Sequence, residues 1–232
     1  MSTKDAVSER VRLRRHAERG SYDPEVIEGI LDEAYFCHVG FVAEGHPVVL
    51  PTVHVRLGDW LYLHGAAANA MFAACAGQTV CVTATILDGL VLARSVYDHS
   101  MNFRSVVVFG VAEDVVDAEE KRDALRALVD HVVAGRSLEA KEPSELELKA
   151  TRVLRVSIDE ASAKVRTGPP KDAAANLALG VWAGVVPLRL VAGEPVQDVQ
   201  IAGDIPLPGY LQPERLASRH RRGESRPADF PG

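Results

Sequence analysis

The 232-residue sequence has few cysteines, and their arrangement excludes two classes of small site. Cys37, Cys75 and Cys81 are odd in number, widely spaced and without a C-x-x-C pair. A disulfide framework or a structural zinc site needs cysteines that are paired or closely spaced. No apolar stretch approaches the roughly 20 residues that a membrane helix requires, and the charged N-terminus is unlike a signal peptide. We therefore expect a cytoplasmic protein with no metal site and no membrane segment.

Basic residues are outnumbered by acidic residues in the sequence. Its 26 Lys and Arg residues face 32 Asp and Glu residues, which gives a formal net charge of −6. Proteins that bind nucleic acid need a basic surface to neutralise phosphates, so we expect no nucleic-acid partner. The glycine-rich motifs G-x-G-x-x-G and G-x-x-x-x-G-K-[ST] are absent, which excludes Rossmann and P-loop nucleotide sites. Arginines cluster near both ends, where we expect solvated arms or subunit contacts.

What the sequence does have is enough apolar residues, 47%, to build a core in one main domain. We expect a basic N-terminal arm over residues 1–22 and a main domain over residues 23–166. A segment rich in Gly and Pro, residues 167–211, is interpreted as a C-terminal wrapping arm. The polar, Arg-rich residues 212–232 are expected to be a disordered tail.

Three helices are predicted by their caps and their apolar spacing. Asp23 and Pro24 form a good start for a helix over residues 24–35. The Ala-rich residues 66–76 predict a short helix that Gly77 ends. Residues 117–134 predict an amphipathic helix that packs on the main sheet.

The remaining pattern is that of strands. Short apolar runs separated by turn residues predict six strands, and a barrel-like sheet is the typical result. A further strand is predicted by alternation over residues 153–165. The six predicted strands are Phe36–Ala43, Val48–Leu57, Trp60–His64, Thr79–Leu87, Leu90–Ala93 and Phe103–Val116.

Two histidines lie next to a predicted hairpin turn. A two-residue type II′ turn at Gly58-Asp59 sets the register and places His54 opposite Leu63. His64 then points to the other face of the sheet, so a metal site shared by the two imidazoles is excluded. His54 is interpreted as a surface or barrel-rim histidine.

Four stretches of the sequence resemble one known family. The chain is similar to the pyridoxamine 5'-phosphate oxidase-like FMN-binding split-barrel family, in its flavin-nucleotide-binding or nitroimidazole-resistance-like branch. The resemblance implies a mainly β, α+β fold: a six-stranded antiparallel split β-barrel with flanking helices and a C-terminal wrapping arm. The matching stretches are Leu50-Pro51-Thr52-Val53-His54-Val55, Leu61-Tyr62-Leu63-His64-Gly65, Ala93-Arg94-Ser95 and Asn102-Phe103-Arg104-Ser105 through Gly110.

The resemblance also implies a function. It predicts a homodimer with FMN near the subunit interface, acting as a flavin reductase or nitroreductase-like oxidoreductase on a small organic substrate. The alternative is a non-catalytic carrier or sensor of flavin or haem on the same barrel. FAD, a deazaflavin or haem are the other cofactors considered.

Site residues follow from the resemblance, together with two physical arguments. A strand offers backbone groups to the polar edge of a flavin ring, and a turn into a helix offers N–H groups to a phosphate. Relatives place Ser, Arg or Lys in that turn, whereas this chain has alanines at positions 66–68 and 70, so weak FMN binding or a replaced cofactor is expected. The predicted cofactor-binding residues are Pro51, Thr52, Val53, His64, Gly65, Ala66, Asn69, Arg94, Arg104 and Ser105.

Catalytic residues are less well indicated. His99, in the loop Asp98-His99-Ser100, is the one candidate proton donor. A nucleophilic triad is excluded because no G-x-S-x-G elbow exists. For Arg104, an edge position or a structural ion pair is the alternative to cofactor binding. For Trp182, the alternatives are closure over the site or the dimer seam and core packing.

Overall fold

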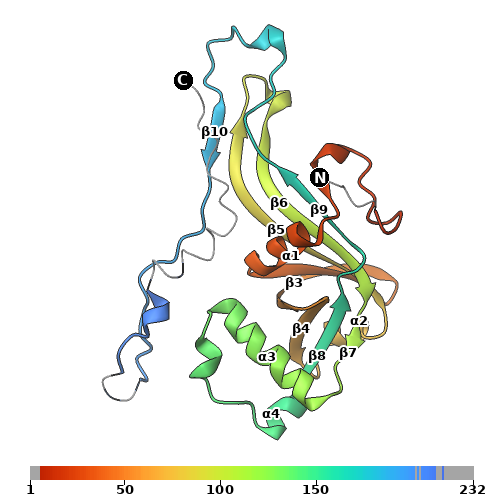
Figure 1. The fold of residues 1–232 in the computed structure, drawn as a ribbon, viewed down its shortest axis with the longest axis vertical. Coiled ribbons are helices and arrows are strands. Elements are labelled where there is room, and N and C mark those ends of the chain that lie inside the picture. The colour runs from red at the N-terminus through yellow and green to blue at the C-terminus, as the bar shows by residue number, and fades with distance from the viewer. Residues whose placement is uncertain (1–5, 202, 204, 213–215, 217–232) are drawn as a thin grey trace.

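The computed structural model describes residues 6–201, 203, 205–212 and 216, and Figure 1 shows an open, mainly antiparallel sheet with helices around it. Within these residues the sheet has ten strands, ordered β1-β9-β6-β5-β2-β3-β4-β8-β7, with β10 paired to β5. The predicted α+β split-barrel fold is confirmed. The helices are α1 Pro24–Glu33, α2 Ala70–Cys75, α3 Ala118–Val132 and α4 Glu145–Ala150. The strands are β1 Gly20–Ser21, β2 Phe36–Ala43, β3 His46–Leu57, β4 Trp60–Ala66, β5 Thr79–Leu92, β6 Ser100–Val111, β7 Glu113–Asp114, β8 Thr151–Ser157, β9 Ala161–Arg166 and β10 Gly184–Pro187. Short 3-10 turns are η1 Ala17–Arg19, η2 Val96–Asp98, η3 Arg136–Leu138, η4 Ala174–Asn176 and η5 Gly209–Leu211.

The helices begin where side-chain caps satisfy their first N–H groups. Asp23 accepts a hydrogen bond from the Glu25 N–H at 3.1 Å, and Pro24 stands at the first helical position. Asn69 caps α2 in the same way through the Met71 N–H, so this helix begins at Ala70 and is shorter than predicted.

Four strand predictions are wrong in detail. Thr79–Leu87 and Leu90–Ala93 are one strand, β5, with an irregularity between Leu87 and Gly89. The predicted strand over residues 153–165 is two strands, because the chain turns at residues 158–160 from one half of the sheet to the other. The first half, β8, pairs with β4, and the second, β9, pairs with β6. Likewise, the run predicted as Phe103–Val116 is β6, which begins at Ser100, followed by the separate short strand β7.

The predicted hairpin between β3 and β4 is confirmed. Gly58 has φ 58°, as the first central position of a type II′ turn requires, whereas Asp59 is not in a positive-φ conformation. The register pairs Leu57 with Trp60 and His54 with Leu63. His54 and His64 therefore point to opposite faces of the sheet.

Two apolar clusters hold the fold together. The larger lies between the sheet and α1 and α2, and includes Leu31, Leu61, Phe72 and Val106. The smaller lies between α3 and strands β3, β4 and β8. Burying each such side chain contributes about 1.5–3 kcal/mol, so α3 is fixed to the sheet mainly by this cluster. Its buried members are Val55, Tyr62, Val115, Ala124, Leu128 and Val153.

One face of strands β2, β3, β5 and β6 is turned away from the larger core, and we call it the outer face. The strand register places Pro51, His38, Thr83 and Val107 in one row across it. Apolar side chains on this face are open to solvent: Phe36 is 52%, Val42 63% and Val49 64% exposed.

The two arms of the chain contact the sheet at different places. The N-terminal arm pairs Gly20 with Lys164 of β9, and the guanidinium of Arg10 lies 5.4 Å from the centre of the Phe109 ring. The C-terminal arm joins the sheet through β10 and then runs along one side of the molecule (Figure 1). Trp182, on this arm, is 65% exposed, so the core-packing alternative for it is wrong. The predicted tail of residues 212–232 lies, apart from residues 212 and 216, outside the described residues.

Candidate functional site

A pocket of about 620 Å³ lies between α3, the chain that connects α3 to α4, and strands β3 and β4. Its volume is within the range of about 300–1,000 Å³ that is typical of cofactor sites. Apolar side chains form most of its wall, and charged side chains from the connection stand at its edge. It is lined by Val53, His64, Leu125, Arg126, Leu128, Val129, Val132, Val133, Arg136, Ser137, Ala140, Lys141, Glu142, Pro143 and Glu147.

His64 is the one imidazole among these lining residues. Its Nδ1 is buried and has no hydrogen-bond partner in the described structure. Burial lowers the pKa of His64 below its ordinary value of 6.5, because the charged form loses its hydration. An unpaired polar atom in an apolar site is costly, so it indicates a position that a ligand completes.

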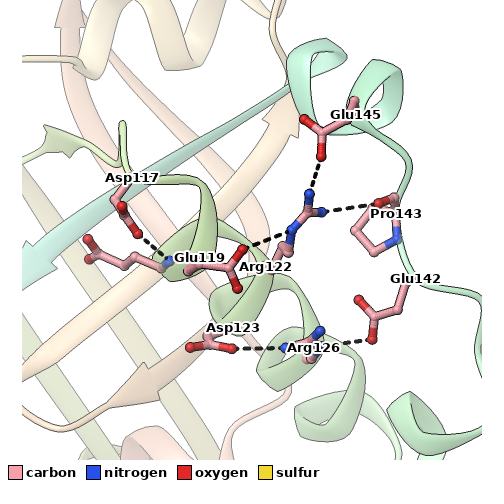
Figure 2. Close-up of polar contacts among 9 residues, drawn as sticks. Asp117, Glu119, Arg122, Asp123, Arg126, Glu142, Pro143 and Glu145 are labelled. Atoms are coloured by element: carbon pink, nitrogen blue, oxygen red, sulfur yellow. Dashed lines mark hydrogen bonds and ion pairs between the residues drawn. The ribbon is translucent and has the colours of Figure 1, made fainter.

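Ion pairs hold the outer wall of the pocket against α3, as Figure 2 shows. Arg126 donates to Glu142 at 2.8 Å and to Asp123 at 3.1 Å. Arg122 donates to the Pro143 carbonyl oxygen at 3.2 Å and to Glu145. These contacts hold the connection between α3 and α4 against α3. The outer wall of the pocket is therefore fixed without a bound ligand.

Two further cations stand at the edge of the pocket. Arg136 donates to Glu139 at 3.3 Å and to the Tyr210 hydroxyl at 3.2 Å, and remains 48% exposed. Lys141 is 3.8 Å from Glu147 and is 81% exposed. Such cations suit the carboxylate or phosphate groups of a ligand.

Seven of the ten predicted cofactor residues lie in one region around this pocket. Val53 and His64 line it, and Gly65, Ala66 and Asn69 follow His64 on the turn into α2. The other two, Pro51 and Thr52, precede Val53 on β3. The described pairing of β3 with β4 begins only at His54, so these residues lie before it. These predicted residues therefore lie along one side of the pocket, and their role in binding a cofactor stays a prediction.

The turn after β4 is arranged differently from a phosphate site. The Ala67 N–H donates to the Ala150 carbonyl at 2.8 Å, and the Asn69 N–H donates to Ala66 at 2.9 Å. The side-chain oxygen of Asn69 caps α2. At Gly65, a Cβ atom would lie 2.5 Å from the Phe72 ring, so this glycine allows a close packing contact. Several polar groups of the turn thus serve the fold.

The two predicted arginines lie elsewhere and are paired. Arg104 donates to both Glu33 and Asp88, and these bonds raise its pKa further. Arg94 donates to Asp172 on the C-terminal arm at 3.0 Å. Both arginines therefore form ion pairs within the fold, which is the alternative stated above for Arg104.

The two remaining candidates contact backbone oxygens. Ser105 lies on the outer face, and its hydroxyl is 3.4 Å from the Lys164 carbonyl oxygen. His99 lies in the exposed loop after η2, with Nδ1 2.8 Å from the Ser95 carbonyl oxygen.

The interpretation of His54 as a surface or rim histidine is wrong. The side chain is fully buried, and its Nε2 lies 2.9 Å from the Leu31 carbonyl oxygen at the end of α1. His131 of α3 packs beside it, with ring centres 5.1 Å apart, and its Nε2 lies 2.8 Å from the Ala34 carbonyl oxygen.

His131 also lines a second, larger cleft of about 970 Å³ between α1 and α3. Its wall includes Arg56, Arg104 and His131, and each of these bonds to a group of α1 or of the residue that follows it. The cleft is thus a polar seam that joins α1 to the rest of the fold.

The sequence reasoning missed the α3 side of the first pocket. The amphipathic helix was predicted to pack on the sheet, but Val129 and Val132, which are 36% and 45% exposed, cover the pocket instead. The signal was an apolar stripe wider than packing on the sheet needs. For Arg136 and Lys141 the sequence carries no signal, because they lie on an irregular connection.

Two solved structures among those similar to this chain match it over most of its length. A flavocytochrome from Azotobacter vinelandii is 40% identical, with a TM-score of 0.85, over 89% of this chain and 97% of that one. A FAD- and heme-binding protein from Mycobacterium smegmatis is 37% identical, with a TM-score of 0.79, over 83% of this chain and 95% of that one.

A third structure is similar over a shorter length. It is a putative 5-nitroimidazole antibiotic resistance protein from Bacteroides thetaiotaomicron, 29% identical with a TM-score of 0.52, and the match covers 63% of this chain and 86% of that one. The search of curated proteins gives no match. Among the described residues no helix is long and apolar enough to cross a membrane. The family model described as pyridoxamine 5'-phosphate oxidase matches residues 23–165, and the chain belongs to that family.

Proposed function

We propose that this protein binds a flavin and a haem, and that it is an oxidoreductase that passes electrons between them and a small organic substrate. The observation that carries the proposal is the similarity to a protein described as a flavocytochrome, over 89% of this chain. That match is longer than the family model, which stops at residue 165, so it includes segments outside the barrel. A protein described as FAD- and heme-binding matches almost as far.

The flavin site that we propose is centred on Pro51–Val53. The described pairs of β3 with β4 begin only at His54, so backbone groups of these three residues that point away from β2 are available to the polar edge of a flavin ring. Pro51 lies on the apolar outer face, which would cover one side of the ring. We propose FAD because one relative is named for it; FMN, which the sequence resemblance implies, is the other possibility to be separated by mass.

The chain's own contribution is position and exclusion of water. When bound, the two groups supply the electron chemistry, and the protein orients them and sets their surroundings. The smaller apolar cluster under α3 keeps water from the pocket wall, and the ion pairs of Arg122 and Arg126 hold that wall in place (Figure 2).

We further propose that a second copy of the chain covers the outer face. Phe36, Val42 and Val49 form an exposed apolar area on adjacent strands, which is typical of a subunit interface. Light scattering should give about twice the chain mass of 25.0 kDa, and Val49→Glu should give the single-chain mass with loss of flavin. Leu146→Glu, on the exposed side of α4, is the matched control. A wild-type protein of single-chain mass would contradict the dimer.

Absorption spectroscopy of the purified full chain, with the extracted cofactors identified by mass, tests the proposal itself. We expect flavin bands and a Soret band, both retained after incubation with FAD and hemin and desalting. Anaerobic addition of NADH or NADPH should bleach the flavin and shift the Soret band, and dithionite, which reduces both groups chemically, gives the fully reduced reference spectrum. Flavin without haem would contradict the haem part, and a bound flavin that neither NADH nor NADPH reduces would favour the carrier alternative.

A further inference from the structure

We infer that the haem binds in the pocket under α3, with His64 as the protein ligand of the iron and with Arg136 and Lys141 as partners of its propionates. This inference rests on the proposed function. It assigns the haem to this pocket and not to the larger cleft between α1 and α3 or to the turn before α2.

The first step is the position of His64. Its side chain lines the pocket, and an imidazole nitrogen is a common protein ligand of haem iron. One ring nitrogen of His64, Nδ1, is buried and has no hydrogen-bond partner in the described structure, so it is not used by the fold. His131 of the other cleft differs, because its Nε2 lies at a backbone carbonyl of the α1 region, as does the Nε2 of His54 beside it.

The second step is the number of donors. The described residues hold no group of three His, Cys, Asp or Glu side chains placed to bind a bare metal ion. A single imidazole suits an iron whose other ligands come from a porphyrin. The pocket around it is apolar, with Leu125, Leu128 and Val129 of α3 on the opposite wall. Because aliphatic groups cannot ligate iron, these three side chains would offer the porphyrin apolar surface and no second ligand.

The third step is charge. A haem carries two propionates, and Arg136 and Lys141 stand exposed at the edge of the pocket. Arg126 is less free, because Glu142 and Asp123 already accept its hydrogen bonds (Figure 2). A porphyrin with its apolar edge inward and its propionates toward the α3–α4 connection matches this distribution of charge.

The fourth step is the neighbourhood of the proposed flavin site. Val53 belongs to that site and also lines the pocket, and His64 lies beside it on the adjacent strand. A haem on His64 would thus adjoin a flavin on Pro51–Val53, as electron transfer between the two groups requires.

The test is hemin binding by the full chain and its His64→Ala variant. Wild-type protein reconstituted with hemin should show a Soret band, and carbon monoxide should shift it after reduction if the sixth position is open. His64→Ala should lower the affinity for hemin about a hundredfold or more, and added imidazole should restore the band. His46→Ala, an exposed histidine at the start of β3, is the control and should bind hemin as wild type does.

A second variant keeps the test independent of His64. The double change Arg136→Ala, Lys141→Ala should speed hemin transfer to apomyoglobin about tenfold, with circular dichroism unchanged. Unaltered hemin affinity in folded His64→Ala would overturn the inference, as would loss of flavin in place of haem. Wild-type protein that binds no hemin would instead refute the haem part of the proposed function.

Discussion

The two cavities beside α3 differ in how their polar side chains are used. In the cleft between α1 and α3, Arg104 is held by Glu33 and Asp88, Arg56 by Asp32, and His131 by a backbone carbonyl. In the pocket on the other side of α3, His64 has an unpaired Nδ1. Both cavities are large enough for a ligand.

This difference shows which polar groups serve the fold and which are available for binding. A partly buried cation between two carboxylates is needed by the folded chain, since its removal leaves both carboxylates poorly hydrated and unpaired. An unpaired imidazole in an apolar wall contributes nothing comparable and lowers stability slightly. The size of a cavity therefore says less about function than the state of its polar atoms.

Removal of Arg104 should have the largest effect on stability. Arg104 is 22% exposed, Glu33 9% and Asp88 31%, so Arg104→Ala leaves two poorly hydrated carboxylates without a cation. We expect the free energy of unfolding to fall by about 2–4 kcal/mol in urea denaturation. The control is Arg126→Ala, whose pair with Glu142 is 42% and 51% exposed and should cost less than about 1 kcal/mol. Equal losses in the two variants would remove the distinction between the cavities.

Lowering the pH should reduce the free energy of unfolding through His64, by less than the loss of Arg104 does. Since burial lowers the pKa of His64 in the folded chain, the unfolded chain binds more protons below its ordinary pKa of 6.5. Above pH 6.5 the imidazole is neutral in both states, and His64 does not reduce the free energy of unfolding. As pH falls below 6.5, that free energy decreases by at most about 1.4 kcal/mol per pH unit. In haem-free protein, unfolding free energy measured from pH 7.5 to about pH 5.5 should therefore fall more steeply for wild type than for His64→Gln. Parallel slopes would contradict a desolvated His64.

Much of the fold could be predicted because its signals are local. The cap at Asp23 marks the start of α1, the amphipathic pattern of residues 117–134 marks α3, and the Gly58-Asp59 turn fixes the register of β3 and β4. Alternation over residues 153–165 was misleading for a physical reason. A two-residue period continues through the bend at residues 158–160, so it cannot show that β8 and β9 pair with different strands.

The candidate site was harder because its contacts join distant parts of the chain. Glu33 lies 71 residues from Arg104, so no local pattern indicates that pair. The prediction for His54 was wrong because its Nε2 lies at the Leu31 carbonyl oxygen in the last turn of α1. That contact joins residues far apart in the sequence. The resemblance placed Val53 and His64 at a cofactor, but it carried no information on α3 or on the connection that holds Arg136 and Lys141.

The most direct test of this account is the haem content of the full chain and of His64→Ala, taken from absorption spectra of the same preparations that report the flavin. We predict a Soret band and flavin bands in the wild type, and flavin bands alone in the variant. A Soret band of equal intensity in both proteins would contradict the assignment of the haem to the pocket under α3.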